Sequence, residues 1–182
     1  MKSWRVLAAA CALALSVAGC ASAPEPVGPV SCALLSSREV SYLSTESRNN
    51  PFVPITGLLR GTDEFVVLKV SLSLSQASQV ILEGSVQAED GSEVARLQTL
   101  PQMIRYWQDE DEVPHRDVVA RGNTLTRWYP PSPSFEAKQG RSEYIVVFKG
   151  KKPIPRPATV SLALTLGDGT SQEFTFSLPP KT

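Results

Sequence analysis

The strongest constraint on this chain is an apolar residue at every second position in several separate segments. In residues 65–75, one face carries Lys69 and three serines, and the other carries five apolar side chains: Val66, Leu68, Val70, Leu72 and Leu74. Successive side chains of a β-strand point to opposite faces of a sheet, so this alternation gathers the apolar residues on one face. The segment is therefore predicted to be a β-strand with one buried face.

Two pairs of segments joined by short turns are predicted to form β-hairpins. The first pair is residues 80–88 and 93–97, separated by Asp90-Gly91, a dipeptide that favours tight hairpin turns. The second pair is residues 160–166 and 174–178, with Gly167-Asp168-Gly169-Thr170 between them. A further run, residues 144–148, is apolar on both faces, which is typical of a central strand deep in a sheet.

The spacing of the remaining residues argues against helices. No segment after residue 30 keeps apolar residues at helical spacing for three turns, and 15 prolines divide the chain into short pieces. We therefore expect an all-β fold, an antiparallel β-sandwich of about seven to nine strands. In outline this pattern resembles immunoglobulin-like and fibronectin-type domains, without the Cys-Trp-Cys signature of true immunoglobulin domains. A small barrel is the alternative architecture.

The N-terminus has the pattern of an export signal. Lys2 and Arg5 precede an apolar stretch over residues 6–18, which is too short for a helix that spans about 30 Å of hydrocarbon. At its end, Val17-Ala18-Gly19-Cys20 resembles the lipobox of bacterial lipoproteins. That resemblance implies cleavage before Cys20 and acylation of this cysteine, which would anchor the protein to a membrane without spanning it. A simple secretory signal, cleaved after Ala21 or Ala23, is the alternative.

The same resemblance predicts location and domain organisation. Ala21, rather than Asp, follows Cys20, and in that family this implies sorting to the outer membrane, where the protein would face the periplasm. Residues 1–19 are then the signal peptide, residues 20–30 the lipidated cysteine and a Pro-rich tether, and residues 31–182 a single β-sandwich domain. With Cys11 removed and Cys20 acylated, Cys32 has no partner for an internal disulfide. It could pair with another protein, although a small buried residue is the favoured interpretation.

Charge excludes one class of partner and draws attention to one segment. The chain has 18 Lys plus Arg and 18 Asp plus Glu, whereas nucleic-acid binders carry a strong positive excess, so no nucleic acid is expected as a partner.

Residues 109–117 are densely acidic and contain the only histidine, His115. A calcium loop needs a glycine at its bend, and none occurs between Gly91 and Gly122. A solvated loop is favoured over a metal site.

One segment combines aromatic residues and prolines. Residues 127–135 contain Trp128, Tyr129 and Phe135 together with three prolines. Exposed aromatic side chains beside a stiff backbone can anchor a protein partner, so these three are the candidate partner-binding residues. The alternative is that they close the end of the sandwich.

A basic cluster follows the expected central strand. Prolines separate its members, which are Lys149, Lys151, Lys152 and Arg156. Such a cluster could contact anionic head groups or an acidic partner. Lysines and prolines also prevent sheet edges from pairing with other chains, and protection of an edge is the favoured interpretation.

The sequence contains none of the common catalytic motifs. It has no Gly-x-Ser-x-Gly, His-Glu-x-x-His or Cys-x-x-Cys pattern and no phosphate-binding glycine-rich loop. We therefore expect neither an enzyme nor a cofactor. The leading hypothesis is a membrane-anchored periplasmic accessory or assembly factor of an envelope system, such as a secretion, pilus or surface structure, that binds an envelope protein. The alternatives are a lipoprotein that binds calcium, a glycan or a peptidoglycan fragment, and a hydrolase that uses two carboxylates.

Overall fold

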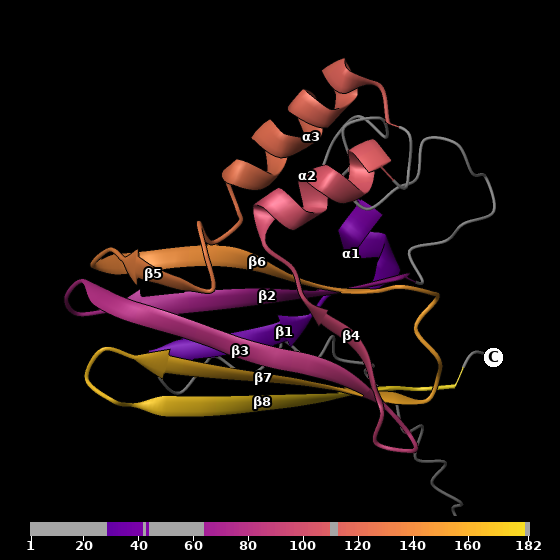
Figure 1. Cartoon of the computed structure of the whole chain (residues 1–182). Coiled ribbons are helices and arrows are strands. Elements are labelled where there is room, and N and C mark those ends of the chain that lie inside the picture. The colour runs from indigo at the N-terminus through magenta and orange to yellow at the C-terminus, as the bar shows by residue number, and fades with distance from the viewer. Residues whose placement is uncertain (1–28, 42, 44–63, 110–112, 181–182) are drawn as a thin grey trace, which may run out of the picture.

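The described part of the protein is predominantly an antiparallel β-sheet. The computed structural model describes residues 29–41, 43, 64–109 and 113–180 (Figure 1). Its strands are β1 (Val30–Leu34), β2 (Phe65–Leu74), β3 (Ser78–Ala88), β4 (Glu93–Leu97), β5 (Ser134–Ala137), β6 (Gly140–Gly150), β7 (Ala158–Leu166) and β8 (Ser171–Leu178). They are ordered β1-β2-β6-β4-β3-β7-β8, and β5 pairs with β3. The predicted antiparallel fold of seven to nine strands is confirmed.

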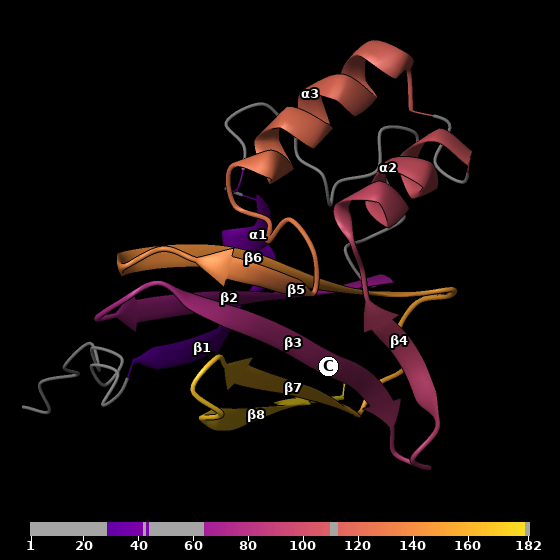
Figure 2. The ribbon, with the colours of Figure 1, turned by 60° about the vertical axis from the view of Figure 1, so that its left-hand side comes forward.

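The sheet bends over on itself into two layers that face each other (Figures 1 and 2). One layer contains β1, β2 and β6, and the other contains β3, β7 and β8; β4 joins them because it pairs with β6 on one side and β3 on the other. The apolar faces of β2 and β7 meet between the layers, where Leu68, Leu72, Leu162 and Leu164 are at most 1% exposed. This first core is the expected interior of a sandwich.

Both predicted hairpins are present. β3 pairs with β4, and β7 pairs with β8 from Ala158↔Leu178 to Thr165↔Ser171. Each turn contains a glycine at positive φ, Gly91 at 81° and Gly169 at 85°, a conformation that costs other residues about 1–2 kcal/mol. The turn sequences read from the chain therefore match the backbone that closes each hairpin.

β6 is the central strand that the sequence predicts. It pairs with β2 from Phe65↔Lys149 to Leu74↔Gly140, and its last residues also pair with β4. Val146 and Phe148 point into the first core, whereas Ile145 and Val147 belong to a second cluster on the opposite face. Both faces of this strand are buried because helices cover the outer one.

The helices were not predicted, because the spacing of apolar residues gave little evidence for them. They are α1 (Ser37–Ser41), α2 (Leu100–Asp109) and α3 (His115–Thr126). The apolar stripe of α2 spans only two turns, and in α3 the charged Arg121 occupies the middle of the buried stripe between Val118 and Leu125. A stripe this short or interrupted gives a weak periodic signal, and packing on a sheet stabilises such helices more than their own propensity does.

The helices form a third layer above β2 and β6 (Figure 1). Phe65 and Val67 of β2, together with Ile145 and Val147 of β6, pack against apolar side chains that include Val40, Met103, Trp107, Val118 and Leu125. This second cluster fixes α2 close to the end of β6, next to the groove described below. No helix in the described ranges is long and apolar enough to cross a bilayer.

Candidate functional site

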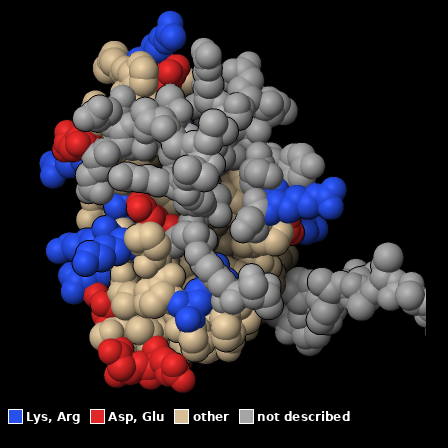
Figure 3. Space-filling view, turned by 90° about the vertical axis from the view of Figure 1, so that its right-hand side faces the viewer, with Lys and Arg blue, Asp and Glu red and all other residues tan. Residues whose placement is uncertain are grey.

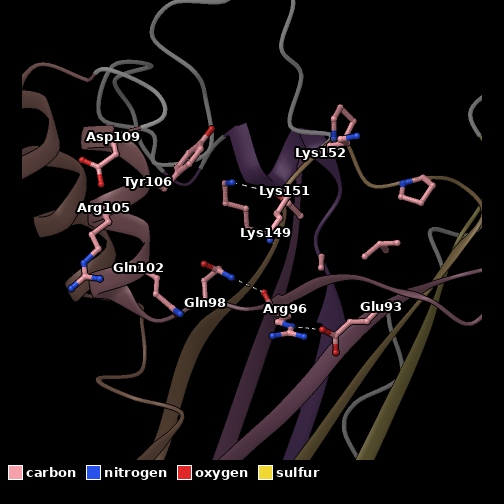
Figure 4. A pocket seen from close by; sticks show the side chains of 15 residues that line it. Glu93, Arg96, Gln98, Gln102, Arg105, Tyr106, Asp109, Lys149, Lys151 and Lys152 are labelled. Carbon is pink, nitrogen blue, oxygen red and sulfur yellow. Dashed lines mark hydrogen bonds and ion pairs between the residues drawn. The ribbon is translucent and has the colours of Figure 1, made fainter.

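A groove of about 880 Å³ lies at the end of the sheet where β6 finishes (Figure 4). One side is α2, the floor includes β4 and the end of β6, and the other side is the connection from β6 to β7. Figure 3 views this end of the molecule and shows Lys and Arg atoms around its middle, with acidic atoms gathered at its lower edge. The groove therefore brings together segments that are more than 50 residues apart in the chain.

Five of the fifteen described residues that line the groove are cationic. They come from β4, α2, β6 and the connection, and they are Arg96, Arg105, Lys149, Lys151 and Lys152. The two carboxylates in the lining are Glu93 and Asp109, and Glu93 forms an ion pair with the Arg96 guanidinium. Apart from Lys149, these cations lie on exposed residues. The groove thus presents a positive surface on a chain whose formal net charge is zero.

Lys149 links the sheet to α2 inside the groove. Its ammonium nitrogen lies 4.1 Å from the centroid of the Tyr106 ring and donates a hydrogen bond to the Gly150 carbonyl oxygen at 3.2 Å. The Tyr106 ring in turn meets Phe65 of β2 edge to face, with the ring centroids 5.6 Å apart. A cation over an aromatic face is attracted by the electron-rich ring. This contact fixes the charge of Lys149 at the base of the groove.

The connection from β6 to β7 is held tightly against the sheet. A Cβ atom on Gly150 would lie 2.7 Å from the Lys152 carbonyl oxygen and 3.0 Å from that of Val94, so only glycine permits this close approach. Further along, Ile154 is buried in the first core, and Pro153 and Pro155 restrict the backbone on either side of it. Lys151 and Lys152 are exposed on this restrained segment.

The start of α2 is fixed by a reciprocal pair of hydrogen bonds. The Thr99 backbone N–H donates to Gln102 Oε1 at 2.7 Å, and the Gln102 N–H donates to Thr99 Oγ1 at 3.4 Å, which is the capping-box arrangement. Just before it, the Gln98 carbonyl oxygen accepts a hydrogen bond from the Tyr129 hydroxyl. Burial raises the pKa of Tyr129 above its usual value, which keeps this hydroxyl protonated and able to donate.

The three predicted partner-binding residues do not form one exposed surface. Trp128 is 43% exposed, but Tyr129 is only 7% exposed and lies in the second cluster beneath α2 and α3. Phe135 is 5% exposed and belongs to the first core, where its ring contacts Tyr144 with centroids 4.8 Å apart. Tyr129 and Phe135 therefore hold the fold together, and a partner could reach only Trp128 of the three.

The basic cluster does not protect a sheet edge. It follows β6 and precedes β7, and each of these strands has neighbours on both sides, whereas β1 and β8 end the sheet. The favoured interpretation from the sequence is therefore wrong. Lys149, Lys151 and Lys152 line the groove, and Arg156 lies instead in a shallow pocket beside the β3–β4 turn.

The remaining candidate residues lie apart from one another. Cys32 is free and half-buried in β1, and burial raises the pKa of its thiol to about 12. Asp109 ends α2, and His115 begins α3, so both flanks of the acidic segment are helical. Residues 110–112 and Cys20 lie outside the described residues. Within the described ranges, no three His, Cys, Asp or Glu side chains are grouped so that they could hold a metal ion.

Sequence reasoning identified the lysines of the groove but missed Arg96 and Arg105. Two local signals could have found the helix that carries Arg105. Thr99-x-x-Gln102 is a capping-box pattern, and the apolar residues Leu100, Met103, Ile104 and Trp107 follow helical spacing. No local signal places Arg96 opposite the lysines, because that proximity arises from the pairing of β4 with β6.

Comparisons with known proteins give only distant structural similarity. No protein-family model matches this chain, and no curated protein matches it. Among solved structures, a chain from the Salmonella enterica SafA pilin in complex with the SafB chaperone is similar at 15% identity, with a TM-score of 0.32. The match covers 65% of this chain and 48% of that one, so this chain spans about half the length of the protein it matches. A likeness this distant indicates neither a partner nor a function.

Proposed function

We propose that this protein is a lipid-anchored envelope protein that binds another protein and has no catalytic activity. Cys20 carries the lipid, the outer membrane holds the anchor, and the folded domain faces the periplasm as an accessory or assembly factor. One structural relationship supports this proposal: the described chain begins at the end of the sandwich opposite the groove. A protein attached to a membrane through its N-terminus would therefore keep the groove accessible.

The pairing of the strands gives this relationship. Val30, the first residue of β1, pairs with Leu72, and Leu72 pairs with Ser142 near the start of β6. The groove begins at Lys149, seven residues further along β6, which is roughly 23 Å at about 3.3 Å per residue. Figure 1 shows β1 beginning at the left, whereas β4 and the β6–β7 connection lie at the right.

The length of the tether adds to this access. Residues 21–30 contain three prolines and one glycine, a composition that favours extended conformations of about 3.1 Å per residue. Ten such residues could hold the domain up to roughly 30 Å from the bilayer. The groove would then lie on the side of the domain that is remote from the membrane.

The chemistry of the groove favours binding over catalysis. None of the described residues that line it is a serine, cysteine or histidine, and of its two carboxylates, Glu93 is paired with Arg96. Its lysines and arginines are suited instead to charge pairing with another molecule. Binding is therefore the activity that the site supports best.

The anchor and the binding activity can be tested separately. Mass spectrometry of the N-terminal peptide from purified outer membranes should show an acylated Cys20, and the Cys20→Ser protein should stay soluble. A photo-crosslinking amino acid at position 152, in the groove, should capture one abundant envelope protein. The same probe at position 138, at the opposite end of β6, should not. An unmodified Cys20, or equal capture from both positions, would contradict the proposal.

A further inference from the structure

The groove has an excess of positive charge, and one of its two acidic residues is already in an ion pair. Its lining side chains include three more cations than carboxylates, and Glu93 is already paired with Arg96. Figure 4 shows Arg105 on the α2 side and Lys152 on the side of the connection. A negatively charged occupant would therefore meet cations from two separate segments. Such charge complementarity speeds association and selects against cationic or neutral partners.

The two lysines of the connection are presented on a restrained backbone. Ile154 is buried in the first core, and Gly150 allows the chain to pack closely against β4. Because the backbone is already ordered, an occupant would mainly have to order the lysine side chains. The arrangement is therefore suited to reversible capture of a charged segment.

The size and the apolar part of the lining favour a polypeptide over a single small anion. The volume of about 880 Å³ lies near the upper end of the usual range for ligand pockets, about 300–1,000 Å³. Val94, Pro153 and Pro155 also line the groove and contribute apolar surface. A groove that presents both cationic and apolar surface matches an extended segment that contains both acidic and apolar residues.

The position of the groove argues against anionic head groups of the protein's own membrane. The described chain begins at the opposite end of the sandwich, roughly 23 Å away along the strands. A tether attached there would direct the groove away from the bilayer. A protein segment that approaches from the other side would meet no such obstacle.

We infer that the groove binds an acidic segment of a partner polypeptide. The Asp and Glu side chains of that segment pair with Arg105, Lys151 and Lys152, and its apolar residues contact Val94 and the prolines. This inference rests on the proposed function and names the chemistry of the partner. It predicts that binding depends on salt, because the exposed cations of the groove are screened as ionic strength rises.

The test uses the full chain with Cys20→Ser and a fluorescent twelve-residue peptide in which Glu alternates with Val and Ala. Fluorescence anisotropy should show binding at 50 mM salt that weakens at 500 mM salt. The same peptide with Gln in place of Glu should bind at least about tenfold more weakly, because the charge pairs are lost. Equal binding of the Glu and Gln peptides would overturn the inference.

A matched pair of variants localises the binding. Lys151→Glu with Lys152→Glu should weaken binding of the acidic peptide about tenfold. Lys138→Glu with Arg141→Glu makes the same change in net charge at exposed positions near the other end of β6, and it should change the affinity less than threefold. Circular dichroism confirms that both variants fold. Equal losses in the two variants would mean that net charge, rather than the groove, attracts the peptide.

Vesicles test the competing class of partner. Binding to phosphatidylglycerol vesicles with no binding of the acidic peptide would replace the polypeptide with a lipid surface and overturn the inference. Because these measurements use the soluble Cys20→Ser protein, they do not depend on acylation. Peptide binding together with an unmodified Cys20 would reject the lipid anchor and support binding of an acidic segment in the groove. An acylated Cys20 without peptide binding would support the lipid anchor and reject binding of an acidic segment.

Discussion

The guanidinium carbon of Arg121 lies 5.8 Å from the centroid of the Trp107 ring, and both side chains are at most 1% exposed. Trp107 belongs to α2 and Arg121 to α3, so this contact joins the two helices above β6. A cation buried against an aromatic face gains more than an exposed one, because water does not compete for the charge. The position of α2, and with it one side of the groove, depends on this packing.

Replacing Arg121 with Ala should destabilise the protein by about 2–4 kcal/mol, since it leaves a cavity and removes the contact with Trp107. Arg121→Met fills most of the space without the charge and should cost less. Urea unfolding followed by tryptophan fluorescence measures both. An Arg121→Ala variant as stable as the natural protein would show that α2 and α3 do not depend on this residue.

Two glycines should respond to alanine in opposite directions. A Cβ on Gly84 would lie 2.4 Å from the Ser161 carbonyl oxygen and 3.0 Å from the Phe148 ring, so Gly84→Ala should cost about 1–3 kcal/mol or more through overpacking. A Cβ on Gly122, in α3, meets nothing within 4 Å. Gly122→Ala should therefore stabilise the protein by about 0.5–1 kcal/mol. Thermal unfolding of the two variants should give shifts of opposite sign.

The aromatic residues of the 127–135 segment should separate into one surface residue and two core residues. Trp128→Ser should destabilise the protein less than Phe135→Ala does, because Trp128 is 43% exposed. Phe135→Ala should cost about 3–5 kcal/mol, and Tyr129→Phe about 1 kcal/mol through loss of the hydrogen bond to Gln98. A large loss from Trp128→Ser would place that side chain in the core.

The Cys32 thiol should be unreactive in the folded protein. Burial raises its pKa to about 12, so little reactive thiolate is present at pH 8. In the Cys20→Ser protein without residues 1–19, alkylation by iodoacetamide at pH 8 should be at least about a hundredfold slower than in urea. Because the folded pKa exceeds the unfolded one, stability should fall as the pH rises above about 9. Equal alkylation rates with and without urea would contradict the burial of Cys32.

The pKa values of the aspartates in the two hairpin turns should respond differently when their hydrogen-bonding neighbours are replaced. Hydrogen bonds lower the pKa of Asp90 mainly through the Ser92 hydroxyl, and that of Asp168 mainly through the Thr170 backbone N–H. Ser92→Ala should therefore raise the pKa of Asp90 more than Thr170→Val raises that of Asp168, as measured by NMR titration. The stabilisation from each depressed pKa is present at neutral pH and is lost as the pH falls through the folded value. Equal shifts would contradict these roles.

The strands, the hairpins and the central position of β6 follow from local patterns in the amino-acid sequence. Alternation with a period of two reports directly which face of a strand is buried, and Asp90-Gly91 and Gly167-Asp168-Gly169 encode their own turns. These are local properties, because a strand or a turn can be predicted from a residue and its near neighbours in the sequence. The burial of both faces of residues 144–148 followed from the same pattern.

The helical layer and the groove depend on contacts between segments that are distant in the sequence. Arg121 interrupts the stripe of α3, and only its burial against Trp107 shows that this charge belongs inside. Tyr129 and Phe135 lie on either side of the same three prolines in the sequence but enter two different cores. Arg96 comes to lie beside Lys149 through the register of β4 on β6. Contacts of this kind join distant segments, so no local pattern encodes them, and the charge of the groove emerges only when the sheet has folded.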